Sequence, residues 1–332
     1  MGLRPGFMVI ANDANITAVI AQKFISMTIT DMVGFESDAL EIVLADDPTN
    51  PIEMPPEGAE LTVSLGYDGA LTNMGLFVVD EIELNGWPAN MVIRGRASVQ
   101  TESKQGKTSL LTQKSRSWTQ GTTIEAIVKK IADEHGLTPQ VSDALKSLTI
   151  PHMDQTDESD LSFLVRLSRR YDAVCKPSGG KLLFVKRGES DLQPVTVLST
   201  QCSSYTMTRS KRESPGTVIA YWHSKKQAKK NEVKVGDGEP VRRLRHWYAD
   251  EATAKSAAQS ELDARKRGED KLSLSLPGNT SYSAEAPLIT AGFRQGVDGD
   301  WVICSVTHTL DKNTGYSCQI EAEKPTNSDE EN

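Results

Sequence analysis

Residues 150–188, IPHMDQTDESDLSFLVRLSRRYDAVCKPSGGKLLFVKRG, carry the most informative local pattern of this chain. An apolar edge precedes a group of acids at the expected start of a helix. Thr156 is suited to cap that helix, because its hydroxyl oxygen can accept a hydrogen bond from a free backbone N–H of the first turn. The first turn would then hold Asp157, Glu158 and Asp160, where the helix dipole favours negative charge.

The rest of this stretch predicts an amphipathic helix followed by a hairpin. Apolar residues recur at helical spacing, and three arginines stand at the C-terminal end, where positive charge is favoured. Gly179 and Gly180 then turn a strand at 173–177 back on a strand at 181–186. The apolar face consists of Leu161, Leu164 and Val165, widened by Phe163 and Leu167, and the arginines are Arg166, Arg169 and Arg170.

The first hundred residues have the pattern of an antiparallel β structure. In Glu60–Tyr67, the residues Leu61, Val63, Leu65 and Tyr67 alternate with polar ones. Short strands separated by proline- and glycine-containing turns are typical of a small barrel or sandwich. Further strands are expected at 7–11, 16–30, 39–44, 75–84 and 90–97, and residues 101–117 are expected to be a linker or an exposed loop.

Two more helices are predicted, one in the middle of the chain and one near its end. Thr122 and Glu125 form a capping box for a helix that Gly136 stops. Asp250 is the N-cap candidate of the other, whose inner face holds Ala254, Ala257, Ala258 and Leu262. Strands are expected at 194–198, 217–223, 232–235, 271–276, 301–310 and 315–322, with Leu272, Leu274 and Leu276 on one face.

Four later blocks follow the stretch at 150–188 in a fixed order. They are TVIAYWHSKKQAKKNEVKVG at 217–236, RHWYADEATAKSAAQSELDARKRG at 245–268, LPGNTSYSAEAPLITAGFRQGVDGDWV at 276–302, and residues 306–323, which end in YSCQIEAE. Together these blocks resemble the phage late control D family, the central baseplate hub of contractile phage tails and of R-type pyocins. They are also similar to the N-terminal part of the VgrG spikes of type VI secretion. The resemblance covers about residues 118–323.

This resemblance implies a mainly β fold with an α+β insertion. Each subunit would hold two small antiparallel β-barrels and an α+β domain, and the subunits would assemble as a ring. We assign residues 1–105 to the first barrel and 106–190 to an α+β domain with two helices and a hairpin. Residues 191–323 form the second barrel, interrupted by a helix near 250–267, and residues 324–332 form a disordered tail.

The function that the resemblance implies is structural, with no catalytic activity and no cofactor. A homotrimer of two-barrel subunits would offer six barrels to a sixfold tail tube and a threefold end to a trimeric spike. The expected partners are therefore the spike protein, the tail tube protein, the tape measure protein and the baseplate wedge proteins. The expected location is the tail baseplate of a virion or pyocin particle, assembled in the cytoplasm of the bacterial host. Because the chain ends soon after the second barrel, we expect the spike to be a separate protein.

Charge is divided unevenly along the chain. Residues 1–90 hold 14 acids and 2 bases, a net charge of −12, whereas residues 209–246 hold 11 bases and 4 acids, a net charge of +7. Such a split indicates distinct surfaces with distinct partners, although both could be solvated faces. Because the acids of residues 1–90 cannot pair within that segment, some must face water. We expect Asp68, Asp80, Glu81 and Glu83 to line a negative channel wall that phosphates would not bind.

Other functions receive less support from the residues. His152, Asp154, Asp157, Glu158 and Asp160 do not have the spacing of a calcium loop, and the helix start already accounts for the acids, so no metal is expected. Gly106, Lys107 and Thr108 match only the end of a phosphate-binding loop, since Thr101 stands where glycine is needed. No nucleophile elbow occurs, and no apolar run is long enough for a membrane helix. Cys175, Cys202, Cys304 and Cys318 are widely spaced, which favours reduced, buried thiols.

Two alternatives remain beside the hub. Residues 118–150 resemble a LysM module faintly, so a peptidoglycan-binding or peptidoglycan-cleaving tail protein is the first. The second is a DNA-binding regulator, suggested by the basic stretch 211–245 and its flanking aromatics. However, Lys225, Lys226, Lys229 and Lys230 lie between two strand patterns, which favours a solvated loop or a protein-facing edge. The overall charge of −8 also disfavours specific nucleic-acid binding.

Overall fold

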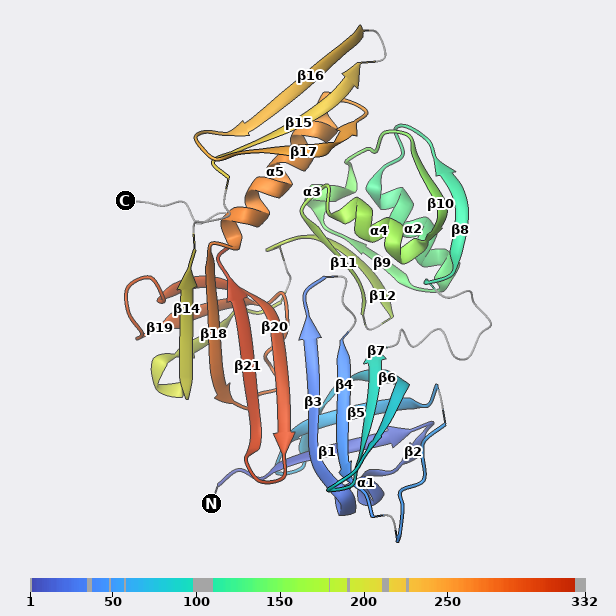
Figure 1. The fold of residues 1–332 in the computed structure, drawn as a ribbon, viewed down its shortest axis with the longest axis vertical. Coiled ribbons are helices and arrows are strands. Elements are labelled where there is room, and N and C mark those ends of the chain that lie inside the picture. The colour runs from blue at the N-terminus through green and yellow to red at the C-terminus, as the bar shows by residue number, and fades with distance from the viewer. Residues whose placement is uncertain are drawn as a thin grey trace. The chain divides into compact units, whose positions relative to one another are not determined.

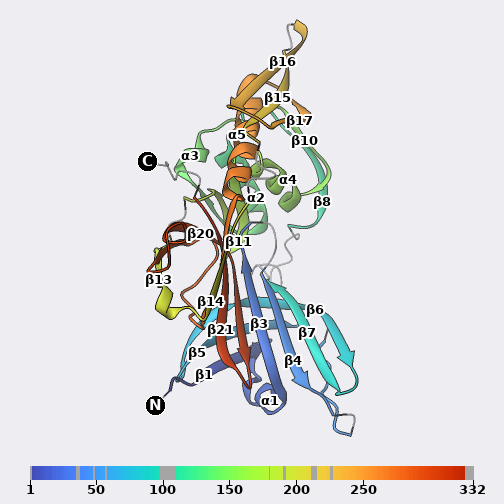
Figure 2. The ribbon, with the colours of Figure 1, turned by 60° about the vertical axis from the view of Figure 1, so that its left-hand side comes forward.

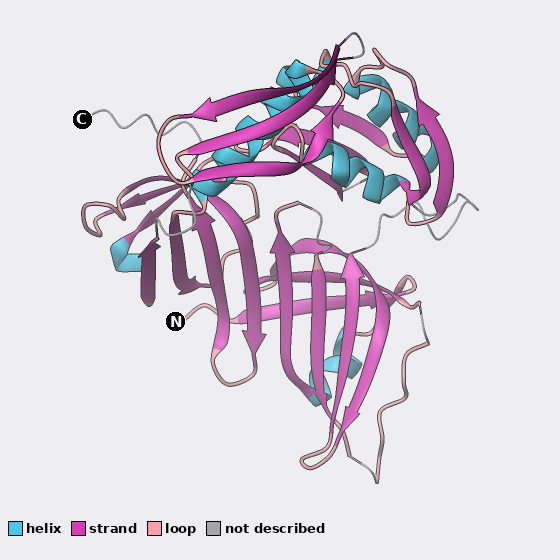
Figure 3. Cartoon of the chain, turned by 45° about the horizontal axis from the view of Figure 1, so that its top comes forward, coloured by secondary structure: helices cyan, strands magenta, loops and turns pink. Residues whose placement is uncertain are grey.

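The computed structural model describes two compact units, each built from separate parts of the chain. Unit 1 consists of Met1–Gln100, Gln193–Thr206 and Leu272–Ala322, and unit 2 of Thr101–Leu192, Met207–Lys271 and Glu323–Asn332. Strands predominate in both units (Figure 3). The described residues are 2–34, 38–47, 49–56, 58–97, 110–178, 180–189, 192–210, 215–224 and 227–325.

Most of unit 1 is one large sheet (Figure 1). Within the described residues it contains 13 strands, in the order β14-β18-β21-β20-β3-β4-β7-β6-β5-β1-β2; in addition, β19 pairs with β20, and β13 pairs with β19. The strands from the start of the chain are β1 Pro5–Ala11, β2 Ala14–Asn15, β3 Phe24–Met32, β4 Ala39–Ala45, β5 Glu60–Tyr67, β6 Ala70–Asn85 and β7 Asn90–Ala97. The later ones are β13 Val195–Leu198, β14 Ser204–Arg209, β18 Asp270–Pro277, β19 Pro287–Ala291, β20 Gly299–Asp311 and β21 Gly315–Glu323, and a short 3-10 helix, Ser199–Gln201, follows β13.

Alternation along the strands produces the core of unit 1. Leu61, Val63 and Leu65 of β5 are buried, as the period of two predicted. Along β18, the residues Leu272, Leu274 and Leu276 are buried in the same manner. The alternation predicted for β18 is therefore confirmed, and that for β5 is confirmed in part, since Ser64 on its polar face is also buried and Tyr67 is only partly buried. The bulkiest fully buried side chains of this unit include Phe77, Met27 and Trp301.

Strands β20 and β3 join the beginning and the end of the chain. They pair antiparallel, with Ser305 opposite Met32 and Asp311 opposite Ser26. The order β21-β20-β3-β4-β7-β6 is visible in Figure 2. The N-terminal and C-terminal β regions therefore share one hydrogen-bonded sheet. No closed barrel is present among the described strands.

The predicted strand at 16–30 is wrong over its first half. Residues Thr17–Lys23 form helix α1, with Ile20 buried, and β3 begins only at Phe24. Ala18, Ala21 and Lys23 favour a helix intrinsically, which the apolar run concealed. The strand expected at 75–84 is longer than predicted, because β6 begins at Ala70.

Unit 2 contains an α+β region and a separate three-stranded sheet covered by a helix. The α+β region has the sheets β10-β8 and β11-β12-β9, and the separate sheet has the order β16-β15-β17. The α+β elements are β8 Gln113–Trp118, α2 Ile124–His135, β9 Thr138–Val141, α3 Asp143–Lys146, β10 Met153–Ser159, α4 Asp160–Ser168, β11 Ala173–Ser178 and β12 Lys181–Lys186. The others are β15 Thr217–Ser224, β16 Gln227–Gly236, β17 Val241–Tyr248 and α5 Glu251–Arg267.

The α+β region confirms the predicted hairpin and corrects two other predictions. Strands β11 and β12 pair antiparallel, and β9 adds to β12 in parallel. The cap of α2 is Thr123 and not Thr122, since the Thr123 side chain accepts a hydrogen bond from the Ala126 N–H at 3.2 Å. Gly136 ends α2 in a left-handed conformation, as predicted. The end of the predicted linker, residues 113–117, belongs to β8 because this segment pairs with β10.

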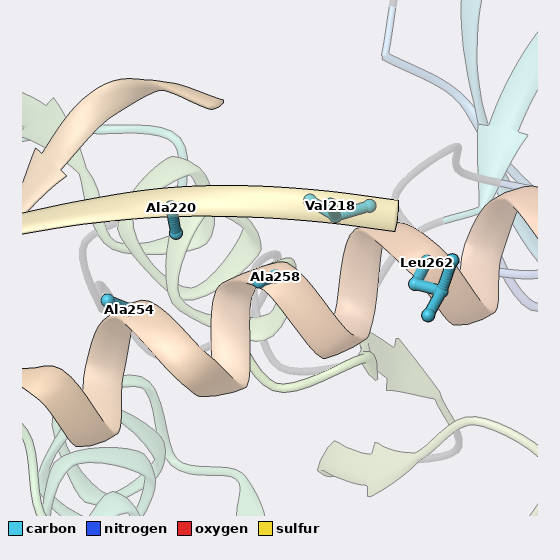
Figure 4. Close-up of a cluster of buried hydrophobic side chains, with 5 residues drawn as sticks. All are labelled: Val218, Ala220, Ala254, Ala258 and Leu262. Atoms are coloured by element: carbon cyan, nitrogen blue, oxygen red, sulfur yellow. The ribbon is translucent and has the colours of Figure 1, made fainter. Parts of the chain in front are cut away.

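Helix α5 packs on one face of the β15–β17 sheet. The Asp250 side chain accepts a hydrogen bond from the Thr253 N–H at 2.8 Å, which confirms the predicted cap. Small side chains allow a close approach between helix and sheet. The buried cluster between them consists of Val218, Ala220, Ala254, Ala258 and Leu262 (Figure 4).

Part of the basic segment before α5 belongs to a strand. We expected Lys225, Lys226, Lys229 and Lys230 to lie in a solvated loop or at a protein-facing edge, and Lys229 and Lys230 belong to β16, an edge strand that pairs with β15. Residues 211–214 and 225–226 lie outside the described residues, as do Gly106, Lys107, Thr108 and residues 326–332 of the predicted tail. None of the described helices is both long and apolar enough to span a membrane.

Candidate functional site

Three of the predicted channel acids lie on β6 beside arginines of β7. The Arg94 guanidinium bonds the carboxylates of Glu41 at 2.9 Å, Glu83 at 2.8 Å and Glu81 at 3.1 Å. These pairs form because β7 lies between β4 and β6. The hydrogen bond from Arg94 is the main reason why the pKa of Glu83 is below its usual value.

Asp80, the third of these acids on β6, and Asp68, the fourth predicted acid, have other partners. Asp80 pairs with Arg96 at 3.1 Å. Asp68 lies in the turn between β5 and β6, where its carboxylate accepts a hydrogen bond from the Arg4 backbone N–H at 3.1 Å. Asp68, Asp80 and Glu81 are exposed and Glu83 is half-buried, so these acids do face water. The charge count over residues 1–90 did not include Arg94 and Arg96, which pair with Asp80, Glu81 and Glu83. These acids are therefore less negative as a group than the count suggested.

The acids of the stretch 150–188 do not start a helix together. Residues Met153–Ser159 form β10, and α4 begins at Asp160 with Ser159 as its cap. Thr156 is therefore not a cap, because it lies within the strand. Ser159 accepts a hydrogen bond from the Ser162 N–H at 3.2 Å. Only Asp160 occupies the first turn of the helix.

Asp160 is the centre of a buried ionic cluster. Its side chain is fully buried, and its carboxylate contacts the Lys114 Nζ at 2.6 Å, the His135 Nε2 at 2.8 Å and the Gln155 amide at 2.8 Å. The Arg116 guanidinium also donates to it. These contacts bring together β8, β10, α2 and the start of α4.

The electrostatics of this cluster favour the ionised carboxylate. Burial raises the pKa of Asp160, but the hydrogen bonds from His135, Lys114 and Gln155 and the charge of Arg116 outweigh burial, so its pKa is below the usual value. Arg116 also contacts Glu134 at 2.8 Å. The positive and negative charges of the cluster therefore balance one another, and the cluster holds the elements of the α+β region together.

His152 and the acids of 154–160 do not converge on one point. His152 is exposed and lies 3.3 Å from Asp154, and Glu158 pairs with Arg166 at 2.7 Å, while Asp160 is buried elsewhere. The side chain of His152 is 57% exposed, so it is not a buried polar anchor. Possible ligand atoms of Glu134, His135 and Asp160 lie within 4.8 Å of one another. However, Lys114 and Arg116 already supply the positive charge at those carboxylates.

The cysteines do not form a nucleophilic site among the described residues. Burial raises the pKa of the Cys175 thiol to about 12, so it stays protonated at neutral pH. Cys318 lies 3.2 Å from the His308 Nδ1, but burial raises the pKa of Cys318 and lowers that of His308, so both are neutral. Cys175 and Cys318 are buried as predicted, whereas Cys202 and Cys304 are only partly buried.

The partners of Asp160 were not predicted from the sequence. Lys114 and Arg116 fall in the segment interpreted as a linker or loop, QKSRSW at 113–118. Its two bases alternate with serines, which is a period-two pattern that could have indicated a polar strand. Their position opposite residues 155–159 follows only from the pairing of β8 with β10.

The comparisons with known proteins agree with one another. Residues 40–314 match the family described as "Phage tail baseplate hub (GPD)". The chain is 33% identical to a probable baseplate hub protein of Escherichia phage 186 over 371 residues, which cover 97% of this chain and 93% of that protein.

Solved structures show the same fold. The chain is similar to the 43 kDa tail protein of prophage MuSo2 from Shewanella oneidensis, with a TM-score of 0.72 and 13% identity over 97% of this chain and 99% of that one. It is also similar to the E. coli c3393 protein, with a TM-score of 0.55 and 11% identity over 91% of this chain and 74% of that one. That protein is described as a component of the type VI secretion system with structural similarity to the T4 bacteriophage tail proteins gp27 and gp5.

Proposed function

Because this chain belongs to the phage tail baseplate hub (GPD) family, we propose that three copies of it form the ring that joins the tail tube to the central spike of a contractile tail. The chain is a structural baseplate hub protein and a component of the tail baseplate of a virion. The observation that carries the proposal is the extent of the relationship, since the related hub protein aligns with 97% of this chain. The particle is a phage or an R-type pyocin.

The ring is proposed from the arrangement of the large sheet. Each subunit would contribute two curved β regions, the predicted barrels at 1–105 and 191–323. Pairing of β20 with β3 supports a rigid connection between these regions. Strand β14 stands at one end of the strand order, so a neighbouring subunit could satisfy its outer backbone groups. A cyclic trimer closes through such heterologous contacts.

The inner wall of the ring is proposed to be acidic. The candidate residues are Asp68, Asp80, Glu81 and Glu83. Support comes from the exposure of the first three and from the composition of the β4–β7–β6 face, where, among the described residues, four carboxylates pair with the two arginines Arg94 and Arg96. A negative wall would repel phosphates, so nucleic acid and the tape measure protein could pass without binding.

We propose that the chain has no catalytic activity. The alternative, a peptidoglycan-binding or peptidoglycan-cleaving tail protein, rested on residues 118–150. These residues do not form a separate module, because β9 pairs with β12 and the Ser142 N–H donates to the Phe184 carbonyl at 3.2 Å. The predicted spike, tube, tape measure and wedge proteins are the partners of the proposed hub.

Light scattering on the purified full-length chain tests this function. The expected mass is three times 36.3 kDa, reached at high concentration or with the spike protein added. A monomer under both conditions would contradict the ring. A pull-down on murein and a zymogram test the alternative, and both should be negative.

A further inference from the structure

The β15–β17 sheet has one face packed on α5 and one face turned away from it. Val218 and Ala220 lie against the helix (Figure 4), and Trp222, Val233 and Val235 pack beside them. Because side chains alternate along a strand, the intervening residues occupy the opposite face. We call this opposite face the outer face; it includes Ile219, Tyr221, His223, Lys234, Arg243 and Trp247.

The aromatic residues of the outer face form a stacked row. The rings of His223 and Trp247 lie 4.2 Å apart and nearly parallel, and Tyr221 lies 5.5 Å from Trp247. The register explains this row, because Tyr221 of β15 stands directly beside Trp247 of β17. Trp247 is nevertheless 46% exposed. A partly exposed tryptophan held in a fixed position is the kind of residue that contributes most to protein–protein binding.

Three bases lie near this row on the same sheet and have no acidic partner among the described residues. Lys234, Arg243 and Arg245 are exposed, and none of them forms an ion pair with a described residue. Arg242 differs, because it points to the other side and pairs with Glu261 of α5 at 2.7 Å. Glu232 is the described acid on the outer face, so the face retains a positive balance. Arginine and aromatic residues together are typical of interface centres.

The chain itself contains a surface of opposite charge. Residues 1–90 have a net charge of −12 and residues 209–246 a net charge of +7. Asp47 and Glu53 are exposed and form no ion pair with a described residue. Charges of opposite sign on two surfaces favour their association and determine its orientation.

We propose that the outer face of the β15–β17 sheet binds the acidic N-terminal region of a neighbouring copy of this chain. This inference rests on the proposed function, which requires several copies in a ring. Trp247 and Tyr221 supply the apolar centre of the contact. Lys234, Arg243 and Arg245 supply its charged rim. The contact is heterologous, since each copy offers a basic face to one neighbour and an acidic region to the other.

Zero-length carbodiimide cross-linking of the full-length protein tests the contact directly. This reagent joins an amine to a carboxylate that it touches, so Lys234 should link to acids of residues 1–90. Mixing unlabelled and 15N-labelled protein distinguishes links between copies from links within one copy. Links from Lys234 that fall only within one copy, or only on acids after residue 90, would overturn the proposal.

Charge reversal then separates this inference from the proposed function. Arg243→Glu with Arg245→Glu, and separately Trp247→Ala, should each weaken self-association by roughly tenfold or more. The matched control is Lys129→Glu with Lys255→Glu, which reverses two exposed bases on α2 and α5 and should leave association unchanged. Light scattering across protein and NaCl concentrations gives the readout, and salt should weaken the wild-type contact.

The possible outcomes are distinct. A wild-type oligomer that is unaffected by both outer-face variants would refute the inference and leave the proposed ring intact. A wild-type chain that stays monomeric with and without the spike would refute both. Melting temperatures near that of the wild type confirm that the variants are folded.

Discussion

Replacement of Asp160 by asparagine removes one charge and almost no volume from the centre of the α+β region. The side chain is fully buried, whereas Arg116 is 16% and Lys114 28% exposed. Loss of one partner from a buried ion pair costs about 3–5 kcal/mol. In the variant, Lys114 and Arg116 are still partly exposed to solvent and still pair with Glu134. We therefore expect a loss at the lower end of this range, about 3 kcal/mol.

Urea unfolding followed by circular dichroism measures this loss. Asp154→Asn is the control, since Asp154 is 57% exposed and should matter little. The thermal midpoint should fall by roughly 6–12 °C for Asp160→Asn. A loss below about 1 kcal/mol, similar to that of the control, would contradict a stabilising role of the cluster.

The same variant has a definite pH dependence. Since the pKa of Asp160 is lowered in the folded state, its stabilisation is present above the unfolded value of about 4. It is lost as the pH falls through the folded value. The difference between wild type and Asp160→Asn should thus be constant from about pH 5 to 8 and shrink below about pH 4. A difference that grows on acidification would refute this assignment. Added zinc or magnesium should not change either midpoint, because Lys114 and Arg116 already neutralise the carboxylates.

The remaining predictions concern packing and capping. Gly278→Ala should destabilise unit 1 by more than about 2 kcal/mol, because a Cβ at this position would overlap the Tyr316 ring; a near-neutral midpoint of urea unfolding would contradict this. Ala258→Leu should cost about 1–3 kcal/mol by overfilling the contact between α5 and β15, again by urea unfolding. Thr123→Ala should cost about 1 kcal/mol and Thr122→Ala clearly less, which thermal unfolding of the two variants would compare.

Local patterns along the chain predicted much of the fold. Alternation located β5 and β18, the Asp250 cap located α5, and the glycine pair at 179–180 located the hairpin β11–β12. Ordered sequence blocks predicted the family, which the match over residues 40–314 confirms. The failures are local as well, as at Thr17–Lys23, where an apolar run has no distinct period.

Long-range features could not be predicted in this way. Asp160 receives its partners from residues 114, 116 and 135, which are distant in sequence and meet only when β8 pairs with β10. The acids of β6 had arginine partners just beyond the segment over which charge was counted. In both cases the sequence could indicate which segments form strands, but it could not indicate which strands lie next to one another in the sheet.

The pairing of β20 with β3 also affects how the protein is made. Because Met32 of β3 pairs with Ser305 of β20, the ribosome must synthesise most of the chain before the large sheet can be completed. At ordinary translation rates this interval lasts on the order of tens of seconds. During this time the edge of β3 is open to pairing with other nascent chains, as unprotected strand edges are. The large sheet of unit 1 can therefore be completed only after β20 has been synthesised, so truncated products that end before β20 should aggregate and not enter the tail.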